Sequence, residues 1–400
     1  MSSKELTLNR KDLARALKLT QKSYLSPGYC EKWNIPFSHS CIVFTADPRT
    51  GVLSVCTSTR DMAVRVSISM SEYEGLTEMF TFAVMAQDIL PVFRRLEGED
   101  IQFRVHEHRL EVLHSFGSFS VPLVEEGLDY FNAKLSGLQE RDTPIHLEME
   151  AASLRSVLNR CAYAIAHDSL RPVLNSISVR TGGDMVDFVA SDGHKLVRIQ
   201  KPVPGAPMSL MIIPEHAVKV LRHILPKEGS VDISYSTAPE DTEKENKAGC
   251  HVGSSTEGID FWFIPADGKY PDYTKVIPKE LDSVATVERN TLLKSLDRLH
   301  FFTSRDYSII SIKESGLHIK VSDKDFHTEA EECIPATLQG KPLTFGMNMK
   351  FLKETLRSIH SGNIQIAGQK PMNPFIVRPE NQSETETVTM LVMPIHVDDK

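Results

Sequence analysis

Cysteine is scarce in this sequence, and the residues that occur are scattered. The six cysteines have neither a CxxC pair nor a histidine pattern beside them: Cys30, Cys41, Cys56, Cys161, Cys250 and Cys333. A disulfide framework or a cysteine-ligated metal site needs matched or clustered spacing. We therefore expect reduced thiols, no metal and no cofactor in a cytoplasmic protein.

Long apolar runs are also missing. No run approaches the ~18 residues that a membrane-spanning helix needs, and the N-terminal Met-Ser-Ser-Lys-Glu has no apolar signal core. The composition, 41% hydrophobic and 24% charged, is typical of globular proteins. We expect no membrane association and no export signal. At roughly 100 to 150 residues per domain, the 400 residues allow three domains.

The clearest pattern lies at residues 144–167. Ile145, Leu147 and Met149 alternate with polar residues, which predicts a half-buried strand. The apolar period then becomes helical, which predicts an amphipathic helix of about four turns through Leu154, Val157, Leu158, Cys161 and Ile165.

This strand–helix unit occurs three times, about 140 residues apart. The first helical anchor, Leu13, Leu154 or Leu292, stands seven residues after Leu6, Leu147 or Ala285. Each third also contains a weaker strand–helix unit, at residues 80–96, 210–225 and 343–359, and closes on a strand ending in proline, at 119–122, 261–265 and 390–394. We predict an α+β fold of three homologous domains, 1–138, 143–278 and 283–400, each made of two similar halves.

The net charge of -8 argues against nucleic acid, but the distribution of charge reverses that argument. At 100° per residue, the outward face of the first helix is almost purely basic. A solvated helix face is the ordinary explanation for one helix, but six basic helices in an acidic chain favour a surface that meets phosphates without reading sequence. The basic positions predicted to face DNA are Lys11, Arg15, Lys18, Lys22, Arg94, Arg95, Arg160, Lys227, Lys294, Arg298, Lys350 and Arg357.

Asp192 and His194 invite an enzymatic interpretation, with His194 as general base and Asp192 orienting it, or with both as metal ligands. No partner nucleophile, phosphate loop or second ligand cluster supports that alternative. A tight turn explains Asp192 and Gly193. It does not explain the apolar Leu196 that follows, which a groove for a partner's apolar side chains would explain.

The run 191–196 (SDGHKL), the run 267–278 (DGKYPDYTKVIP) and the ending 392–395 (VMPI) resemble the bacterial DNA polymerase III beta subunit, the sliding clamp. The resemblance implies that two subunits join head to tail into a ring of six domains, with helices lining a hole for duplex DNA and sheets outside. It implies a non-catalytic, sequence-independent DNA tether for the polymerase. Contacts to phosphate alone would let such a ring slide.

The resemblance also implies a pocket between the second and third domains. Its ligands would be Gln-Leu-x-Leu-Phe-like segments of the polymerase catalytic subunit, the clamp loader and repair proteins. In such grooves a few apolar anchor residues supply most of the binding energy. For each matched residue taken singly, a place in the hydrophobic core is the alternative explanation. The matched residues are Leu174, Ser191, Gly193, His194, Lys195, Leu196, Pro271, Lys275, Val276, Leu391, Met393 and Pro394, with Arg171, Asn348, Phe351, Met372 and Ile395 at the margins.

The family's ring contact, matched onto this sequence, sets Phe119 and Val121 against Phe301 and Phe302 of another subunit. Helical periodicity places Phe301 outward, as exposed aromatic residues at interfaces usually are.

The chain departs from the family pattern at Lys195 and Lys275, where arginine is common, and at Val173, where tyrosine is frequent. The tail 396–400 and the polar loop 236–249 are further features without an assigned role. A protein-binding scaffold without DNA affinity remains an alternative.

Overall fold

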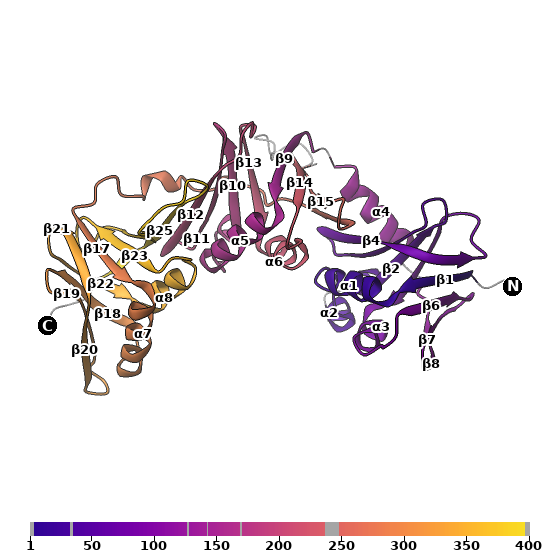
Figure 1. Ribbon diagram of the computed structural model, residues 1–400, viewed down its shortest axis with the longest axis horizontal. Coiled ribbons are helices and arrows are strands. Elements are labelled where there is room, and N and C mark those ends of the chain that lie inside the picture. Colours follow the sequence, from indigo (N-terminus) through magenta and orange to yellow (C-terminus); the bar gives the residue numbers. More distant parts are fainter. Residues whose placement is uncertain are drawn as a thin grey trace. The chain divides into compact units, whose positions relative to one another are not determined.

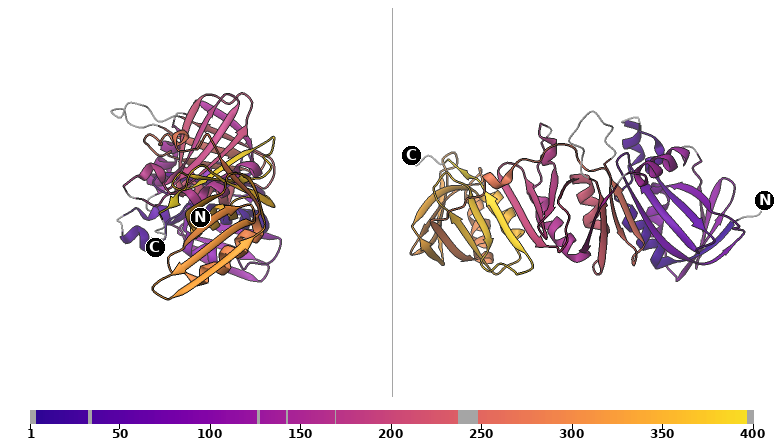
Figure 2. Two further views of the ribbon diagram at one scale, coloured as in Figure 1. Left: turned by 90° about the vertical axis from the view of Figure 1, so that its left-hand side faces the viewer. Right: turned by 90° about the horizontal axis from the view of Figure 1, so that it is seen from above.

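The computed structural model describes residues 4–32, 35–125, 128–141, 143–168, 170–236 and 248–396. The predicted loop 236–249 and the tail 396–400 therefore lie mostly outside the described residues. A similar order of elements occurs three times, with an additional strand, β21, in the third occurrence. We call residues 4–122, 145–263 and 283–392 the first, second and third repeats. Figures 1 and 2 show repeats built mainly of antiparallel strands with helices beside them.

The elements of the first repeat are β1 (Lys4–Asn9), α1 (Arg10–Thr20), α2 (Pro27–Lys32), η1 (Phe37–Ser40), β2 (Cys41–Asp47), β3 (Val52–Ser58), β4 (Met62–Glu74), β5 (Phe80–Met85), α3 (Ala86–Phe93), β6 (Asp100–Val105), β7 (Arg109–His114) and β8 (Gly117–Pro122). Helix α4 (Leu128–Gln139) connects it to the second repeat.

The second repeat consists of β9 (Ile145–Glu150), α5 (Ala151–Cys161), η2 (Ala162–Ala164), η3 (Pro172–Leu174), β10 (Ser176–Gly182), β11 (Met185–Ser191), β12 (Lys195–Pro202), β13 (Ser209–Pro214), α6 (Glu215–Ile224), β14 (Ser230–Tyr235), β15 (Cys250–Ser254) and β16 (Ile259–Phe263). The short helix η4 (Tyr273–Lys275) lies in the connection that follows.

The third repeat consists of β17 (Ser283–Glu288), α7 (Arg289–Leu299), η5 (His300–Phe302), β18 (Tyr307–Lys313), β19 (Gly316–Asp323), β20 (Thr328–Ile334), β21 (Ala336–Gly340), β22 (Leu343–Asn348), α8 (Met349–Arg357), β23 (Asn363–Gly368), β24 (Phe375–Pro379) and β25 (Thr387–Val392). Strand β26 (Pro394–Ile395) follows it.

Each repeat begins with a strand that runs straight into a helix, as the change of apolar period predicts. Leu13, Leu154 and Leu292, the predicted anchors, are each at most 2% exposed. The Asn9 side chain accepts hydrogen bonds from the backbone at the start of α1, and Glu288 does the same for α7. The predicted four-turn helix is shorter than expected, because α5 ends at Cys161 and the chain tightens into a 3-10 turn.

The chain divides into two compact units, Met1–Arg155 with Lys219–Pro265 and Ser156–Val218 with Ala266–Lys400. The division passes through the second repeat, so its strands β9 and β14 to β16 belong to the first unit and β10 to β13 to the second. None of the helices in the described part of the chain is long and apolar enough to cross a membrane.

Antiparallel pairing joins consecutive repeats within each unit. In the first unit, β4 of the first repeat pairs with β16 of the second, with Ala63 opposite Trp262. In the second unit, β12 of the second repeat pairs with β25 of the third, with Leu196 opposite Leu391. In the sheets of the described residues, β8 and β20 each stand at an end.

Candidate functional site

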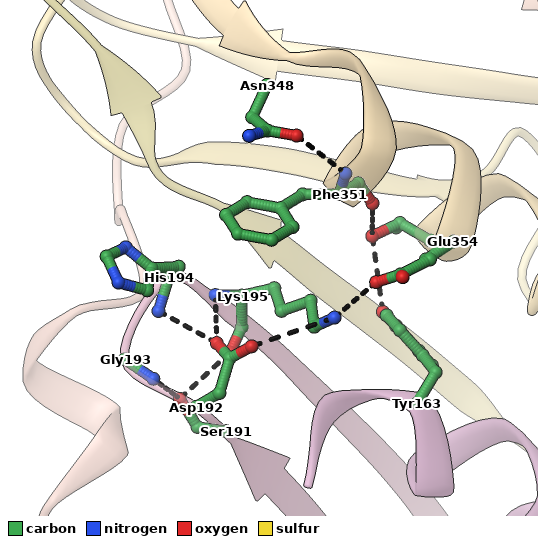
Figure 3. Close-up of polar contacts among 10 residues, drawn as sticks. Tyr163, Ser191, Asp192, Gly193, His194, Lys195, Asn348, Phe351 and Glu354 are labelled. Atoms are coloured by element: carbon green, nitrogen blue, oxygen red, sulfur yellow. Dashed lines mark hydrogen bonds and ion pairs between the residues drawn. The ribbon is translucent and has the colours of Figure 1, made fainter. Parts of the chain in front are cut away.

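The turn at residues 191–196 joins β11 to β12 and is held by its own side chains (Figure 3). The Asp192 carboxylate accepts hydrogen bonds from the backbone N–H groups of His194 and Lys195, both at 2.9 Å. The Ser191 hydroxyl accepts from the Gly193 N–H at 3.2 Å and donates to the Lys195 carbonyl at 2.9 Å. Gly193 has φ +90°, a conformation that favours glycine. The sequence Ser-Asp-Gly therefore fixes this turn.

The enzymatic alternative fails on this geometry. The Asp192 carboxylate contacts the backbone of His194 and Lys195, whereas the His194 ring stacks on Phe351 with centroids 5.7 Å apart. Asp192 therefore does not orient the imidazole as a general base would require. In the described residues, no group of three or more His, Cys, Asp or Glu could hold a metal ion.

Lys195 points inward from the turn rather than into solvent. Its ammonium forms an ion pair with Glu354 of α8, lies 3.6 Å from Asp192, and sits 5.1 Å from the Phe351 ring centroid (Figure 3). The side chain is only 7% exposed. The charge of Lys195 is therefore engaged inside the protein, and its place on the pocket wall stays a prediction.

An apolar cluster lies beneath the turn, and we call it the Leu196 cluster. Pairing of β12 with β25 brings the C-terminal residues to it, and Met393 N–H donates to the His194 carbonyl at 2.8 Å. Val173 and Met393 pack against it from partly buried positions. Its buried members are Ala166, Leu174, Val189, Leu196, Ile212, Tyr270, Tyr273 and Leu391.

The other predicted pocket residues surround this cluster to different degrees. Val276 is 46% exposed and Met372 56% exposed, and Lys275 pairs with Asp272 at 3.5 Å on the surface. The Arg171 guanidinium bonds to Asp168 at 3.1 Å. Pro271 is exposed, Pro394 and Ile395 are partly buried, and Ile395 pairs with Gly346 of β22. Asn348 caps α8 by accepting from the Phe351 N–H at 3.1 Å.

Sequence reasoning missed the aromatic and acidic support of the site. Tyr273 donates to the Asp187 carboxylate at 3.0 Å, and burial together with that carboxylate raises the pKa of Tyr273 to about 12. Burial raises the pKa of Tyr163 as well, and its hydroxyl donates to Thr355 at 3.3 Å. Tyr273 stands inside the conspicuous 267–278 run, which is a signal that could have found it. Nothing local in the sequence links Glu354 to Lys195.

The predicted basic positions are mostly exposed, but several have partners. Arg15 is half-buried and bonds to Glu257 at 2.7 Å, and Arg298 bonds to Glu332 at 2.6 Å. Four of the predicted positions lie just after their helices rather than on them: Lys22, Arg94, Arg95 and Lys227. The positions that are exposed are Lys11, Lys18, Lys22, Arg94, Arg95, Lys227, Lys294, Arg298, Lys350 and Arg357.

The position of Arg160 in the structure contradicts the prediction that this residue faces solvent. Its side chain is 8% exposed, and the guanidinium bonds to the Glu386 carboxylate at 2.5 Å. The ammonium of Lys201 lies 3.4 Å from the other oxygen of the same carboxylate. Arg160 stands at the edge of the apolar face of α5, and the β24–β25 connection that carries Glu386 covers it. Periodicity within α5 could not reveal that cover.

The four aromatic and apolar residues predicted for the ring contact differ in exposure. Phe301 is 87% and Phe302 43% exposed, as expected for a surface that meets a partner. Phe119 is partly buried beside Phe93, with ring centroids 6.2 Å apart. Val121 is only 7% exposed and belongs to the core of its own sheet. Phe116, 79% exposed next to β8, was not predicted.

Solved structures with the same fold are sliding clamps. The DNA polymerase III beta subunit of Thermotoga maritima matches with a TM-score of 0.84 at 17% identity, covering 98% of this chain and 100% of that chain. The DnaN sliding clamp of Pseudomonas aeruginosa bound to griselimycin also has a TM-score of 0.84, at 18% identity, covering 99% of this chain and 100% of that chain. The fold is therefore that of a DNA clamp, and the predicted α+β clamp architecture is confirmed.

Curated relatives carry the name beta sliding clamp. The protein of Synechococcus elongatus is 24% identical over 258 residues, 63% of this chain and 65% of the relative. The protein of Escherichia coli K12 is 22% identical over 315 residues, 76% of this chain and 78% of the relative. The match to the first of these spans slightly less than two thirds of the relative's length.

Two family models match consecutive parts of the chain. The central domain of the DNA polymerase III beta subunit matches residues 148–272, and its C-terminal domain matches residues 274–395. Together these matches cover more than half of the sequence. The chain belongs to the DNA polymerase III beta subunit family.

Proposed function

We propose that this protein is a DNA sliding clamp, a non-catalytic processivity subunit that works in the cytoplasm. Two copies close head to tail into a ring around duplex DNA and tether DNA polymerase III to it. Family membership supports this role. The observation that carries it is a pairing between strands of consecutive repeats, which occurs twice within the chain. The equivalent strands of the first and the last repeat, β8 and β20, are left at sheet ends. We further propose the domains 1–138, 143–278 and 283–400.

The junction follows one rule. Strands β4, β12 and β20 are each the third strand after the first helix of a repeat, and β8, β16 and β25 are each the third strand after the second helix. Within the chain, β4 pairs with β16 and β12 pairs with β25. The strands left over are β20 and β8, which both stand at sheet ends. Their pairing with a second copy would make the same junction a third time and close the ring.

The two internal junctions give the register of the third. Ala63, Leu196 and Thr328 are equivalent, because each pairs with the last residue of the preceding strand. Trp262 stands four residues before Ala266, whose N–H bonds to the Ile212 carbonyl. Leu391 stands four residues before Ile395, which pairs with Gly346 at the equivalent position of the third repeat. Val124 bonds likewise to Ala83, which makes Ser120 the equivalent residue in β8. Because Ala63 faces Trp262 and Leu196 faces Leu391, Ser120 should face Thr328 of the second copy.

Phe301 fits the same scheme. It stands two residues after α7, just as Tyr163 stands two residues after α5. Tyr163 bonds to Thr355 of the next repeat and lies under the Lys195 ammonium, 5.4 Å from its ring centroid. Phe301, 87% exposed in the single chain, would be covered in the same way by the second copy.

Crosslinking tests the ring. In a Cys333→Ser background, which removes the exposed thiol, Ser120→Cys and Thr328→Cys should form an intermolecular disulfide. Facing Cα atoms in antiparallel strands are about 5 Å apart, within disulfide range. Ser118→Cys with Thr328→Cys is the matched control. Ser118 is two residues away from Ser120 along β8, which increases its expected Cα–Cα distance from Thr328 to roughly 8 Å. The covalent dimer should stay on nicked circular DNA and slide off linear DNA, and equal crosslinking of both pairs would contradict the register.

The exposed cations of the helices supply the DNA contact. Lys11 on α1, Lys294 on α7 and Lys350 on α8 are exposed, and lysine attracts the phosphate backbone without reading bases. Topology then supplies processivity, since the ring need not bind tightly to remain on the DNA.

The surface over the Leu196 cluster is the proposed partner site. We infer that it takes Gln-Leu-x-Leu-Phe-like segments of the polymerase catalytic subunit, the clamp loader and other proteins. Leu174, Leu196 and Leu391 form its base, with Val276 and Met393 nearer the surface. A labelled Gln-Leu-x-Leu-Phe peptide should bind with saturable anisotropy and more weakly to Met393→Ala. Met208→Ala, at a methionine 91% exposed elsewhere in the same unit, is the matched control. Equal binding to both variants would place the site elsewhere.

A further inference from the structure

The first repeat contains its own counterpart of the Leu196 cluster. The Val124 N–H donates to the Ala83 carbonyl at 2.9 Å, and the Ala266 N–H donates to the Ile212 carbonyl at the same distance. Ala83 and Ile212 both stand three residues before the second helix of their repeat. The segment that follows the first repeat therefore passes β5 in the same way as the segment that follows the second repeat passes β13.

The two connecting segments continue alike. Leu128 and Phe131 stand four and seven residues after Val124, and Tyr270 and Tyr273 stand four and seven residues after Ala266. Leu128 and Phe131 pack on a cluster that includes Cys56 and Ala83. Tyr270 and Tyr273 belong to the Leu196 cluster, with Val189 and Ile212. The same part of each connection therefore covers the same part of each repeat.

Beyond that point the two connections differ. After the first repeat the helix continues to Gln139, whereas η4 ends at Lys275. The additional turns of α4 bring Leu135 and Leu138 onto Ala63 and Trp262, and Leu138 is only 6% exposed.

The equivalent pair in the second repeat is Leu196 and Leu391, which face each other across the strands as Ala63 and Trp262 do. In the described connection after η4, residues 276–282, no helix continues over this pair. Counted along the connection, the equivalent of Leu135 is Ile277, which packs on the Leu196 cluster from a partly buried position. The equivalent of Leu138 is Glu280, whose carboxylate bonds to Gln369 at 3.2 Å instead. Val276 at 46% exposure and the partly buried Met393 remain at the surface.

We propose that residues 134–138, Lys-Leu-Ser-Gly-Leu, are an internal counterpart of the partner segment. They occupy in the first repeat the position that a partner occupies in the second. Partners of the second site then present two apolar side chains three residues apart on one helical turn, as Leu135 and Leu138 do. The first Leu and the Phe of Gln-Leu-x-Leu-Phe have this same spacing. The inference rests on the proposed partner site, and it leaves one open site per subunit because α4 fills the other.

A synthetic peptide with the sequence of residues 132–140 tests the inference on the full-length chain. The labelled peptide should bind, should be displaced by unlabelled Gln-Leu-x-Leu-Phe peptide, and should bind at least tenfold more weakly to Met393→Ala. The Met208→Ala variant should bind it as the parent does, and thermal melting should confirm that both variants fold. A peptide carrying Leu135→Asp and Leu138→Asp should not bind.

Helical geometry has its own test. The peptide with Gly137→Ala should bind about threefold to fivefold more tightly, because alanine favours helix over glycine. Weaker binding of that peptide would overturn the helical form of the inference. If Gln-Leu-x-Leu-Phe binds and the 132–140 peptide does not, or binds without competition, the internal counterpart is wrong while the clamp function stands. If neither binds to the folded protein, the partner site itself is wrong.

Discussion

Lys195 of β12 and Glu354 of α8 form an ion pair that ties the 191–196 turn of the second repeat to the second helix of the third. The lysine is almost fully buried, and Asp192 supplies a second carboxylate 3.6 Å from its ammonium. A buried pair of this kind stabilises little relative to an apolar pair, but breaking it leaves a charge without its partner. The turn that shapes the candidate partner site therefore depends on a contact far away in the sequence.

Replacing Glu354 with Gln should lower the free energy of unfolding by about 3 kcal/mol, at the lower end for a broken buried pair because Asp192 remains. Urea unfolding of the parent and variant measures the change. The double variant Lys195→Met with Glu354→Gln should lose less than Glu354→Gln alone, because no buried ammonium is left without its main partner, and Asp192 keeps its hydrogen bonds from the backbone N–H groups of His194 and residue 195. An unchanged midpoint in Glu354→Gln would show that the pair is not energetically coupled.

Arg160 and the exposed lysines should respond in opposite ways. Arg160→Met removes one of the two cations that contact the partly buried Glu386 carboxylate, so we expect lower stability, by about 2 to 3 kcal/mol, without a change in DNA loading by the folded protein. Lys294→Glu with Lys350→Glu should weaken loading onto nicked circular DNA and reduce the salt dependence of loading, with stability nearly unchanged. Melting temperature and DNA loading, measured on the same samples, separate the two effects. Reduced loading by folded Arg160→Met would show that Arg160 contributes to the DNA surface after all.

Asp323 should control the acid stability of the segment that carries Phe301. Its carboxylate accepts hydrogen bonds from the Ser304 hydroxyl at 2.5 Å and the Ser304 N–H at 2.8 Å, and these bonds lower its pKa to about 2. Because the folded pKa lies below the unfolded value of 3.8, this stabilisation is complete above pH 3.8 and is lost as the pH falls toward 2. Acid unfolding of Asp323→Asn should lack that part of the pH dependence. Parallel acid curves for the parent and the variant would contradict this assignment.

Tyr273 should affect the stability of the protein at alkaline pH. Its pKa is raised from 10.0 to about 12, so the protonated phenol that bonds to Asp187 is favoured by the fold. Its stabilisation is present below pH 10 and is lost as the pH rises toward 12. The stability advantage of the parent over Tyr273→Phe should therefore shrink by about 1 kcal/mol between pH 9 and pH 11, measured by urea unfolding. A constant difference across that interval would show that the phenol does not titrate with folding.

Local patterns in the sequence determined the repeated strand–helix units. The change from period two to period 3.6 at Leu147 and Leu154, found again in both other thirds, marks where strands end and helices begin. The Ser-Asp-Gly turn was equally local, because Asp192 bonds to the backbone two and three residues away. The resemblance of the 191–196 and 267–278 runs to the family could likewise be recognised without a structure, and the family matches confirm it.

Only the tertiary structure decided which charges are available and which apolar residues are covered. Arg160 and Lys195 have the composition of surface residues but meet Glu386 and Glu354, acids more than 150 residues away in the chain. Val121 on β8 and Phe301 on the 3-10 helix η5 are both apolar, yet one is core and the other exposed, because the element that covers an apolar side chain comes from elsewhere in the chain. Helix α4 shows the same limit. Its leucines indicate an apolar face, but its position over Ala63 and Trp262 follows from the pairing of β4 with β16, a contact between distant segments that no local pattern determines.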